Sequence, residues 1–176
     1  MVEGFGGPLL RAGDDGYDEA RTVFNAMIDR RPAVIAQCES VSDVQAALSY
    51  ARANGLEIAV RSGGHSVAGA GTLDEGLVID LRRLNDVRVD ADAQTATVGG
   101  GATWADFDRA TQPFGLATTG GRVSSTGVAG LTLGGGSGWF EREWGLACDN
   151  LVEVELVAAD GRVVTASAEE NSELFW

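Results

Sequence analysis

The chain has 176 residues, a formal net charge of −13 and 44% hydrophobic residues. The hydrophobic content suffices for a folded core, and the acidic balance argues against nucleic acid, which needs a basic patch. All 13 basic residues are arginine, which excludes a Walker-type lysine, a Schiff base and a pyridoxal phosphate anchor. Since no apolar run reaches about 18 residues and no export signal is visible, we expect a soluble cytoplasmic protein with no membrane partner.

The first part of the chain predicts alternating helices and strands that lead into a glycine-rich loop. Phe24 and Met27 have the spacing of one apolar helix face, and Asn54-Gly55 is a typical C-cap pair. The predicted elements are a helix over 19–30, a strand over 33–36, a helix over 42–53 and a strand over 58–60. The last strand therefore delivers the loop that follows it.

The second part of the chain predicts two hairpins separated by a helix and a second glycine-rich segment. Thr103 and Asp106 form the Thr-x-x-Asp pattern that starts a helix. The predicted elements are a strand over 77–81, a hairpin of 87–90 and 95–98, a helix from 103 to about 110, and a hairpin of 151–159 and 162–166. Segment 118–138 is rich in Gly, Ser and Thr, but its interleaved aliphatic residues argue against a disordered linker.

The loop over 61–71 contains His65, the only histidine of the chain. Glycines allow backbone N–H groups to approach and point at a bound anion without a lysine. An imidazole in such a loop places a reactive nitrogen beside that anion. A turn with one hydrogen-bonded histidine is the structural alternative.

Other cofactor sites are not indicated. The Gly-x-Gly pattern that starts at Gly134 has Trp139 where a dinucleotide fingerprint needs its third glycine, and the one that starts at Gly99 has Trp104 there. Two distant cysteines and one histidine do not make a zinc site or a disulfide framework. We expect no metal and no nicotinamide bound through a Rossmann fold.

The His65 loop, the Thr126-Gly127-Val128-Ala129-Gly130 stretch and the glycines that follow it resemble the FAD-linked oxidase family with a PCMH-type FAD-binding domain. This family includes the vanillyl-alcohol oxidase and berberine-bridge types. The resemblance implies an α+β fold in which two α+β subdomains clasp FAD. It implies a helical lead-in over 1–30, a first FAD-binding subdomain over 31–80 and a second, incomplete one over 81–176. The substrate domain would be absent, and the aromatic ending at Phe175-Trp176 is also read as a truncation.

The resemblance also implies which residues contact the cofactor. His65 would carry FAD covalently, and Val123 lies near the position where some family members have a second attachment through cysteine, so a single link is expected. Cys148 is expected to be a small buried residue. The implied FAD-binding residues are Arg61, Ser62, Gly63, Gly64, His65, Ser66, Gly71, Gly120, Thr126, Gly127, Gly130, Gly134, Gly135, Gly138 and Asn150.

The implied function is that of an FAD-dependent oxidase. A small-molecule substrate would give a hydride to flavin from a C–H bond next to a hydroxyl or amine, and O2 would reoxidise the flavin. The catalytic base is expected outside this chain, so the 176 residues alone are expected to be inactive. The alternatives are an FAD dehydrogenase or reductase of the same fold with non-covalent flavin, a flavin-binding module without turnover, and a glycine-rich scaffold without a cofactor.

Overall fold

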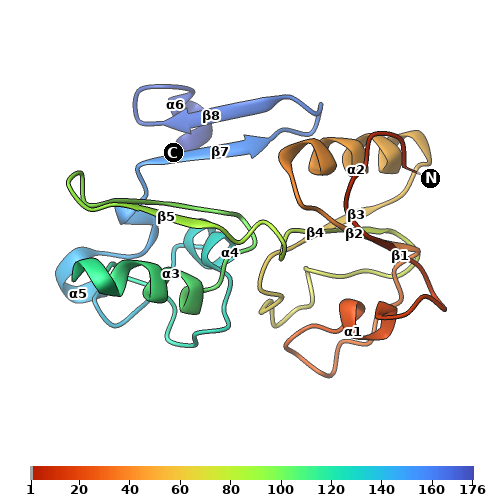
Figure 1. Ribbon diagram of the computed structural model, residues 1–176, viewed down its shortest axis with the longest axis horizontal. Coiled ribbons are helices and arrows are strands. Elements are labelled where there is room, and N and C mark those ends of the chain that lie inside the picture. The colour runs from red at the N-terminus through yellow and green to blue at the C-terminus, as the bar shows by residue number, and fades with distance from the viewer. Residues whose placement is uncertain (1) are drawn as a thin grey trace.

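The computed structural model describes residues 2–176 and has two α+β lobes side by side (Figure 1). The first lobe is built on a four-stranded sheet with the order β1-β2-β4-β3. Its elements are β1 (Leu9–Leu10), α1 (Tyr17–Arg21), β2 (Val34–Gln37), α2 (Val41–Ala53), β3 (Ile58–Arg61) and β4 (Leu77–Asp80). Strands β2, β4 and β3 are parallel, and β1 is antiparallel to β2.

The second lobe consists of hairpins and short helices. Its elements are β5 (Val87–Asp90), β6 (Thr95–Val98), α3 (Trp104–Thr111), the 3-10 helix η1 (Gln112–Phe114), α4 (Val128–Leu133), α5 (Glu141–Trp144), the 3-10 helix η2 (Cys148–Asn150), β7 (Glu153–Val157), β8 (Val163–Ser167) and α6 (Ser172–Phe175). Strand β5 pairs antiparallel with β6, and β7 pairs antiparallel with β8. Both predicted hairpins are confirmed.

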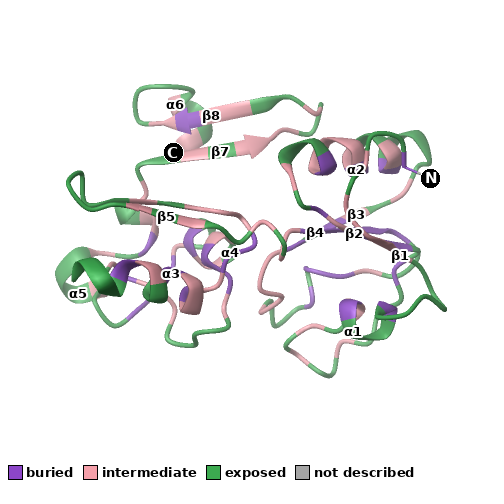
Figure 2. Cartoon of the chain, viewed as in Figure 1, coloured by how far each residue is buried: buried purple, intermediate pink, exposed green. Residues whose placement is uncertain are grey.

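The central sheet is buried on both faces, because α2 covers one face and α1 the other (Figure 2). Ala47 and Ala51 of α2 are fully buried, and such small side chains let the helix lie close to the sheet. On the other face Tyr17 packs with Ile35 and Val78, and its hydroxyl donates a 2.7 Å hydrogen bond to the carbonyl of Pro32. All four residues of β4 are buried. Strand β3, which pairs with β4 and leads into the His65 loop, is therefore anchored on a buried neighbour.

The second lobe has its own small core of Trp104, Phe107, Val128 and Ala147. Helix α3 begins at Thr103 with the predicted capping box: the side chains of Thr103 and Asp106 each accept a hydrogen bond from the other residue's backbone N–H. The predicted helix start is therefore confirmed, and it aims Trp104 into the core beneath the second glycine-rich segment.

The predicted helix over 19–30 is wrong, since α1 ends at Arg21. Thr22 takes an extended backbone, and its hydroxyl donates to the Glu19 carbonyl at 2.8 Å, which closes the helix. Phe24 and Met27, placed by the pattern on a buried helix face, are 64% and 87% exposed. The turns that replace the helix carry Phe24 toward the His65 loop.

The remaining differences from the predictions concern where one helix begins, two elements that were not predicted, and one cysteine. Helix α2 begins at Val41, because Ser40 rather than Ser42 caps it by accepting a hydrogen bond from the N–H of Asp43. Strand β1 and helix α4 were not predicted, and Cys148, expected to be buried, is partly exposed. Within residues 2–176 both cysteines are free, and no helix is long and apolar enough to cross a membrane.

Candidate functional site

The two glycine-rich segments meet directly. Gly63, in the loop after β3, faces Gly127, which precedes α4. A Cβ atom added at Gly63 would lie 2.9 Å from the Cα atom of Gly127, and one added at Gly127 would lie 2.5 Å from the N atom of Gly63. Only glycine tolerates this approach. The contact joins the first lobe to the second, and we call it the glycine seam.

Both segments present unused backbone donors around the glycine seam. Within residues 2–176, none of the N–H groups from 62 to 68 or from 120 to 125 donates a hydrogen bond. Gly64, with φ +72, turns the first segment in a way that L side chains rarely adopt. Successive free N–H groups in such turns form anion-binding concavities. The loop therefore suits a ligand that accepts several hydrogen bonds, such as a pyrophosphate.

Two buried side-chain donors at the start of this loop are also without a partner in the part of the chain described. They are the Nε atom of Arg61 and the hydroxyl of Ser62. Buried polar groups are hydrogen-bonded in nearly all proteins, so unpartnered ones call for an explanation. A bound group rich in acceptor oxygens is one that both donors fit.

His65 lies between the two segments. Its Nε2 atom is 3.0 Å from the hydroxyl of Ser125, and its Nδ1 atom is 3.4 Å from the hydroxyl of Thr126. The ring of Phe24 is stacked on the imidazole, with 4.1 Å between centroids and 17° between planes. Burial lowers the pKa of His65 below its ordinary value, which favours the neutral ring with one nitrogen lone pair.

A buried charge cluster supports the loop from below. The guanidinium of Arg61 donates to the carbonyl of Ala20, and its Nε atom lies 3.2 Å from the place of a Cβ atom at Gly64. Burial, reinforced by the positive charge of Arg82 and opposed by the negative charge of Asp80, lowers the pKa of Arg61 to about 10. Register places Arg61 beside Asp80 on the adjacent strand, so one buried carboxylate compensates two arginines.

Replacing Asp80 with asparagine is expected to lower the free energy of unfolding by about 3 kcal/mol, since one partner of a buried ion pair is lost. Asp80 is 1% exposed and accepts from Arg82 Nε at 2.9 Å and from Arg82 Nη2 at 2.6 Å. Urea unfolding at neutral pH measures the loss. Asp160→Asn is the control: it removes an exposed pair with Arg162 and should leave the free energy of unfolding nearly unchanged, because solvent screens exposed ion pairs. Equal losses in the two variants would contradict this account of the cluster.

The second glycine-rich segment is fastened to the second lobe. Gly120 and Gly121 lie on the indole of Trp104, where added Cβ atoms would come within 2.5 and 2.8 Å of ring carbons. Gly138 approaches Gly120 so closely that its Cβ atom would lie 2.9 Å from the N atom of Gly120. The guanidinium of Arg122 stacks on Trp139 at 5.1 Å from the ring centroid. The segment is thus an ordered part of the fold.

The structure brings some of the predicted FAD-binding residues together and leaves others apart. Those at or beside the glycine seam are Ser62, Gly63, Gly64, His65, Thr126 and Gly127, with Arg61 beneath them and Gly71 packed on Arg61. Ser66 accepts hydrogen bonds from the loop itself. Gly130 has open space around it, and Gly134 and Gly135 follow α4. Asn150 donates to the carbonyls of Trp144 and Leu146 and so pins its own loop.

Phe24 and Ser125 are the site residues that sequence reasoning missed. Phe24 was assigned to a helix face, and Ser125 stood as one hydroxyl in a segment rich in them. One feature of the sequence could have indicated the position of Phe24: Asn25 interrupts the apolar pattern. Its side chain donates to the carbonyl of Val67 at 2.8 Å. That bond ties the segment after α1 to the His65 loop.

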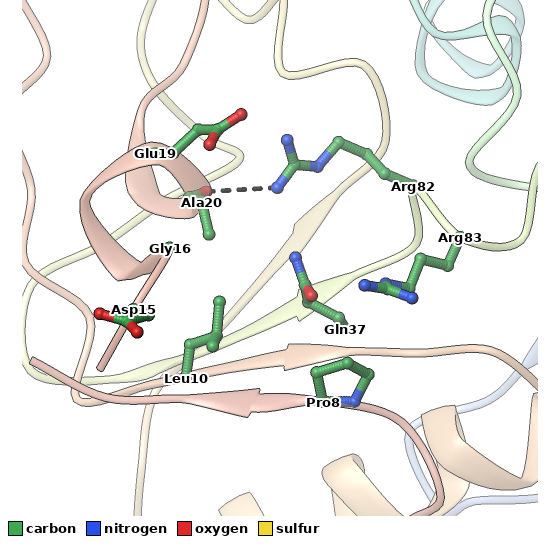
Figure 3. A pocket seen from close by; sticks show the side chains of 9 residues that line it. All are labelled: Pro8, Leu10, Asp15, Gly16, Glu19, Ala20, Gln37, Arg82 and Arg83. Atoms are coloured by element: carbon green, nitrogen blue, oxygen red, sulfur yellow. Dashed lines mark hydrogen bonds between the residues drawn. The ribbon is translucent and has the colours of Figure 1, made fainter.

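A pocket of about 390 Å³ lies at the other side of the charge cluster (Figure 3). Arg82 and Arg83 line one side and Asp15 and Glu19 the other, so its charges largely balance. None of the predicted FAD-binding residues lines it. We assign it no role in cofactor binding.

The geometry defines a class: an α+β domain whose two lobes present free backbone amides and one imidazole at a glycine seam. Comparison with known proteins is consistent with this class, since the FAD binding domain family matches residues 32–167. The (R)-6-hydroxynicotine oxidase of Paenarthrobacter nicotinovorans is 40% identical over 170 residues, which are 97% of this chain and 37% of that protein.

Solved structures agree. The crystal structure of 6-hydroxy-D-nicotine oxidase from Arthrobacter nicotinovorans has a TM-score of 0.96 at 40% identity and covers 98% of this chain and 38% of its own. Glucooligosaccharide oxidase from Acremonium strictum, whose FAD is 6-S-cysteinyl and 8α-N1-histidyl, has a TM-score of 0.91 at 34% identity, covering 96% of this chain and 36% of its own.

The chain belongs to the FAD binding domain family. The resemblance to FAD-linked oxidases and the α+β, PCMH-type fold expected from the sequence are both confirmed. The chain spans little more than a third of the length of the relatives it matches.

Proposed function

We propose that the chain binds FAD and forms the cofactor-binding part of an FAD-dependent oxidoreductase. The observation that carries the proposal is the set of free backbone N–H groups on both sides of the glycine seam, together with the unpartnered Nε of Arg61 and hydroxyl of Ser62. In this proposal residues 62–66 hold the pyrophosphate, and segment 120–138 passes along the rest of the cofactor. The family match and the oxidases among the relatives support it.

We further propose that FAD is attached to His65. The neutral ring nitrogen supports this, as does the histidyl FAD of the Acremonium strictum oxidase. Attachment breaks one C–H bond of the 8α-methyl group and the imidazole N–H bond and forms one N–C bond. The two electrons and two protons released pass through the flavin ring to O2, which becomes hydrogen peroxide. Val123 offers no thiol, so a second link is not proposed.

The proposed reaction removes a hydride from a small molecule, at a C–H bond next to a hydroxyl or an amine. Bound FAD supplies the two-electron acceptor, and O2 takes the electrons from it. The residues of this chain would hold the cofactor, prevent it from dissociating and fix the flavin ring at His65. Oxidases among the relatives support this reaction class.

Gel filtration of the purified protein after incubation with FAD tests the proposal. We expect about one flavin per chain to co-elute, with the visible absorption of a flavoprotein, because the loop donors bind the pyrophosphate. Riboflavin, which lacks the pyrophosphate, is the matched control and should be retained far less. A colourless protein peak, with all the FAD eluting as free cofactor, would refute FAD binding.

A further inference from the structure

Three side chains from two distant segments hold the imidazole of His65. Ser125 and Thr126 contact its two nitrogens, and Phe24 covers one ring face. Ser125 lies in this position because of the glycine seam: its carbonyl would be 3.0 Å from a Cβ atom at Gly63. The same backbone contact that joins the two lobes therefore presents the Ser125 hydroxyl to His65.

Phe24 is held in place by the loop that it covers. Its backbone N–H donates to the carbonyl of Gly64 at 3.1 Å. The adjacent side chain, Asn25, donates to the carbonyl of Val67 at 2.8 Å. Because bonds from this segment reach the loop on both sides of His65, the stacked ring restricts rotation of the imidazole about its own side-chain bonds.

The two contacts to the ring nitrogens differ in strength. At 3.0 Å, the Nε2–Ser125 distance is that of a normal N–H···O hydrogen bond, whereas the 3.4 Å between Nδ1 and Thr126 exceeds the usual range. A hydroxyl both donates and accepts, so Ser125 can form this hydrogen bond with Nε2 in either tautomer of the neutral imidazole. The shorter contact therefore anchors Nε2, and Nδ1 is the less engaged of the two ring nitrogens.

We propose that Ser125 is a positioning residue for flavin attachment: its hydroxyl holds His65 in the orientation that makes Nδ1 the nucleophile, while Phe24 fixes the ring plane. This inference rests on the proposed attachment of FAD to His65. Ser125 neither receives nor donates a group in the reaction. It acts only through the imidazole, so it should affect how fast the bond forms and not how tightly FAD is first bound.

The test is the rate of covalent attachment. Protein produced under riboflavin limitation is mixed with saturating FAD, samples are quenched in acid, and protein-bound flavin is measured by intact mass. Ser125→Ala should attach FAD about tenfold more slowly, the effect of one lost hydrogen bond to the reacting group. The non-covalent Kd for FAD should be unchanged. Ser125→Thr, which retains a hydroxyl, should restore most of the rate.

Ser172→Ala is the matched control, since Ser172 lies in α6, outside both glycine-rich segments, and its side-chain hydroxyl makes no hydrogen bond within residues 2–176; it should attach FAD at the wild-type rate. An unchanged rate in Ser125→Ala, or a deficit that higher FAD concentration removes, would overturn the positioning role. NMR of the flavin peptide should show substitution at Nδ1, and substitution at Nε2 would also overturn it. If the wild-type protein binds FAD but never attaches it, the proposed attachment itself fails, which is a distinct outcome.

Discussion

Replacing His65 with alanine is expected to remove all covalently held flavin while leaving non-covalent FAD binding in place. His65 is the only histidine and the chain has no lysine, so no other side-chain nitrogen of comparable nucleophilicity is present. The backbone donors of the loop do not depend on the imidazole. The folded His65→Ala protein should therefore remain yellow. Acid precipitation should release all of its flavin, and the mass of the denatured protein should be that of the unmodified chain.

The two cysteines are the alternative attachment points, so the control for this experiment is a cysteine variant. Cys38 is fully buried, and burial, reinforced by the negative charges of Asp43 and Asp80, raises the pKa of its thiol to about 12, which makes it a poor nucleophile. Cys148 is partly exposed. Cys148→Ser should carry as much covalent flavin as the wild type. Covalent flavin retained in His65→Ala and lost in Cys148→Ser would show that the thiol is the attachment point.

Replacing Gly63 with alanine is expected to have the largest effect on the fold around the site. Gly63 has an ordinary backbone conformation, so alanine meets no strain there, and the effect comes only from the methyl group. That methyl group would lie 2.9 Å from the Cα atom of Gly127 and 3.0 Å from the carbonyl oxygen of Ser125. Both are backbone atoms, which cannot move aside as the end of a flexible side chain can. We expect a loss of about 3 kcal/mol in the free energy of unfolding, the upper end for overpacking, and a large loss of FAD affinity.

Urea unfolding and FAD titration measure the two effects of Gly63→Ala. Gly130→Ala is the control for stability, because Gly130 lies in α4 with no atom within 4 Å of an added Cβ. Alanine there should leave stability unchanged or raise it by up to about 1 kcal/mol through helix propensity. A Gly63→Ala protein as stable as the wild type would show that the two lobes can separate at the glycine seam without cost.

The parts of the site that sequence reasoning predicted are those set by local rules. The strand before His65 follows from its apolar run, and the two hairpins and the cap at Thr103 follow from turn and capping patterns. Those rules act over a few residues. They mark the two glycine-rich segments along the chain, but they do not say which glycine of one segment meets which glycine of the other.

The contacts that shape the site connect distant residues, and this is why the pattern missed them. His65 and Ser125 are separated by 60 positions in the sequence, and their contact depends on how the two lobes pack. The segment around Phe24 has helical spacing, yet Thr22 ends the helix and Asn25 binds the loop instead. Tertiary contacts there outweigh a weak local preference.

The measurement that tests the central claim most directly is mass spectrometry of the peptides obtained by digesting the denatured wild-type protein. The account predicts one flavin-bearing peptide, with the FAD-derived mass located on His65. A protein in which the peptide containing His65 is entirely unmodified, although FAD binds, would contradict covalent attachment. A flavin located on Cys148 would contradict the assignment of His65.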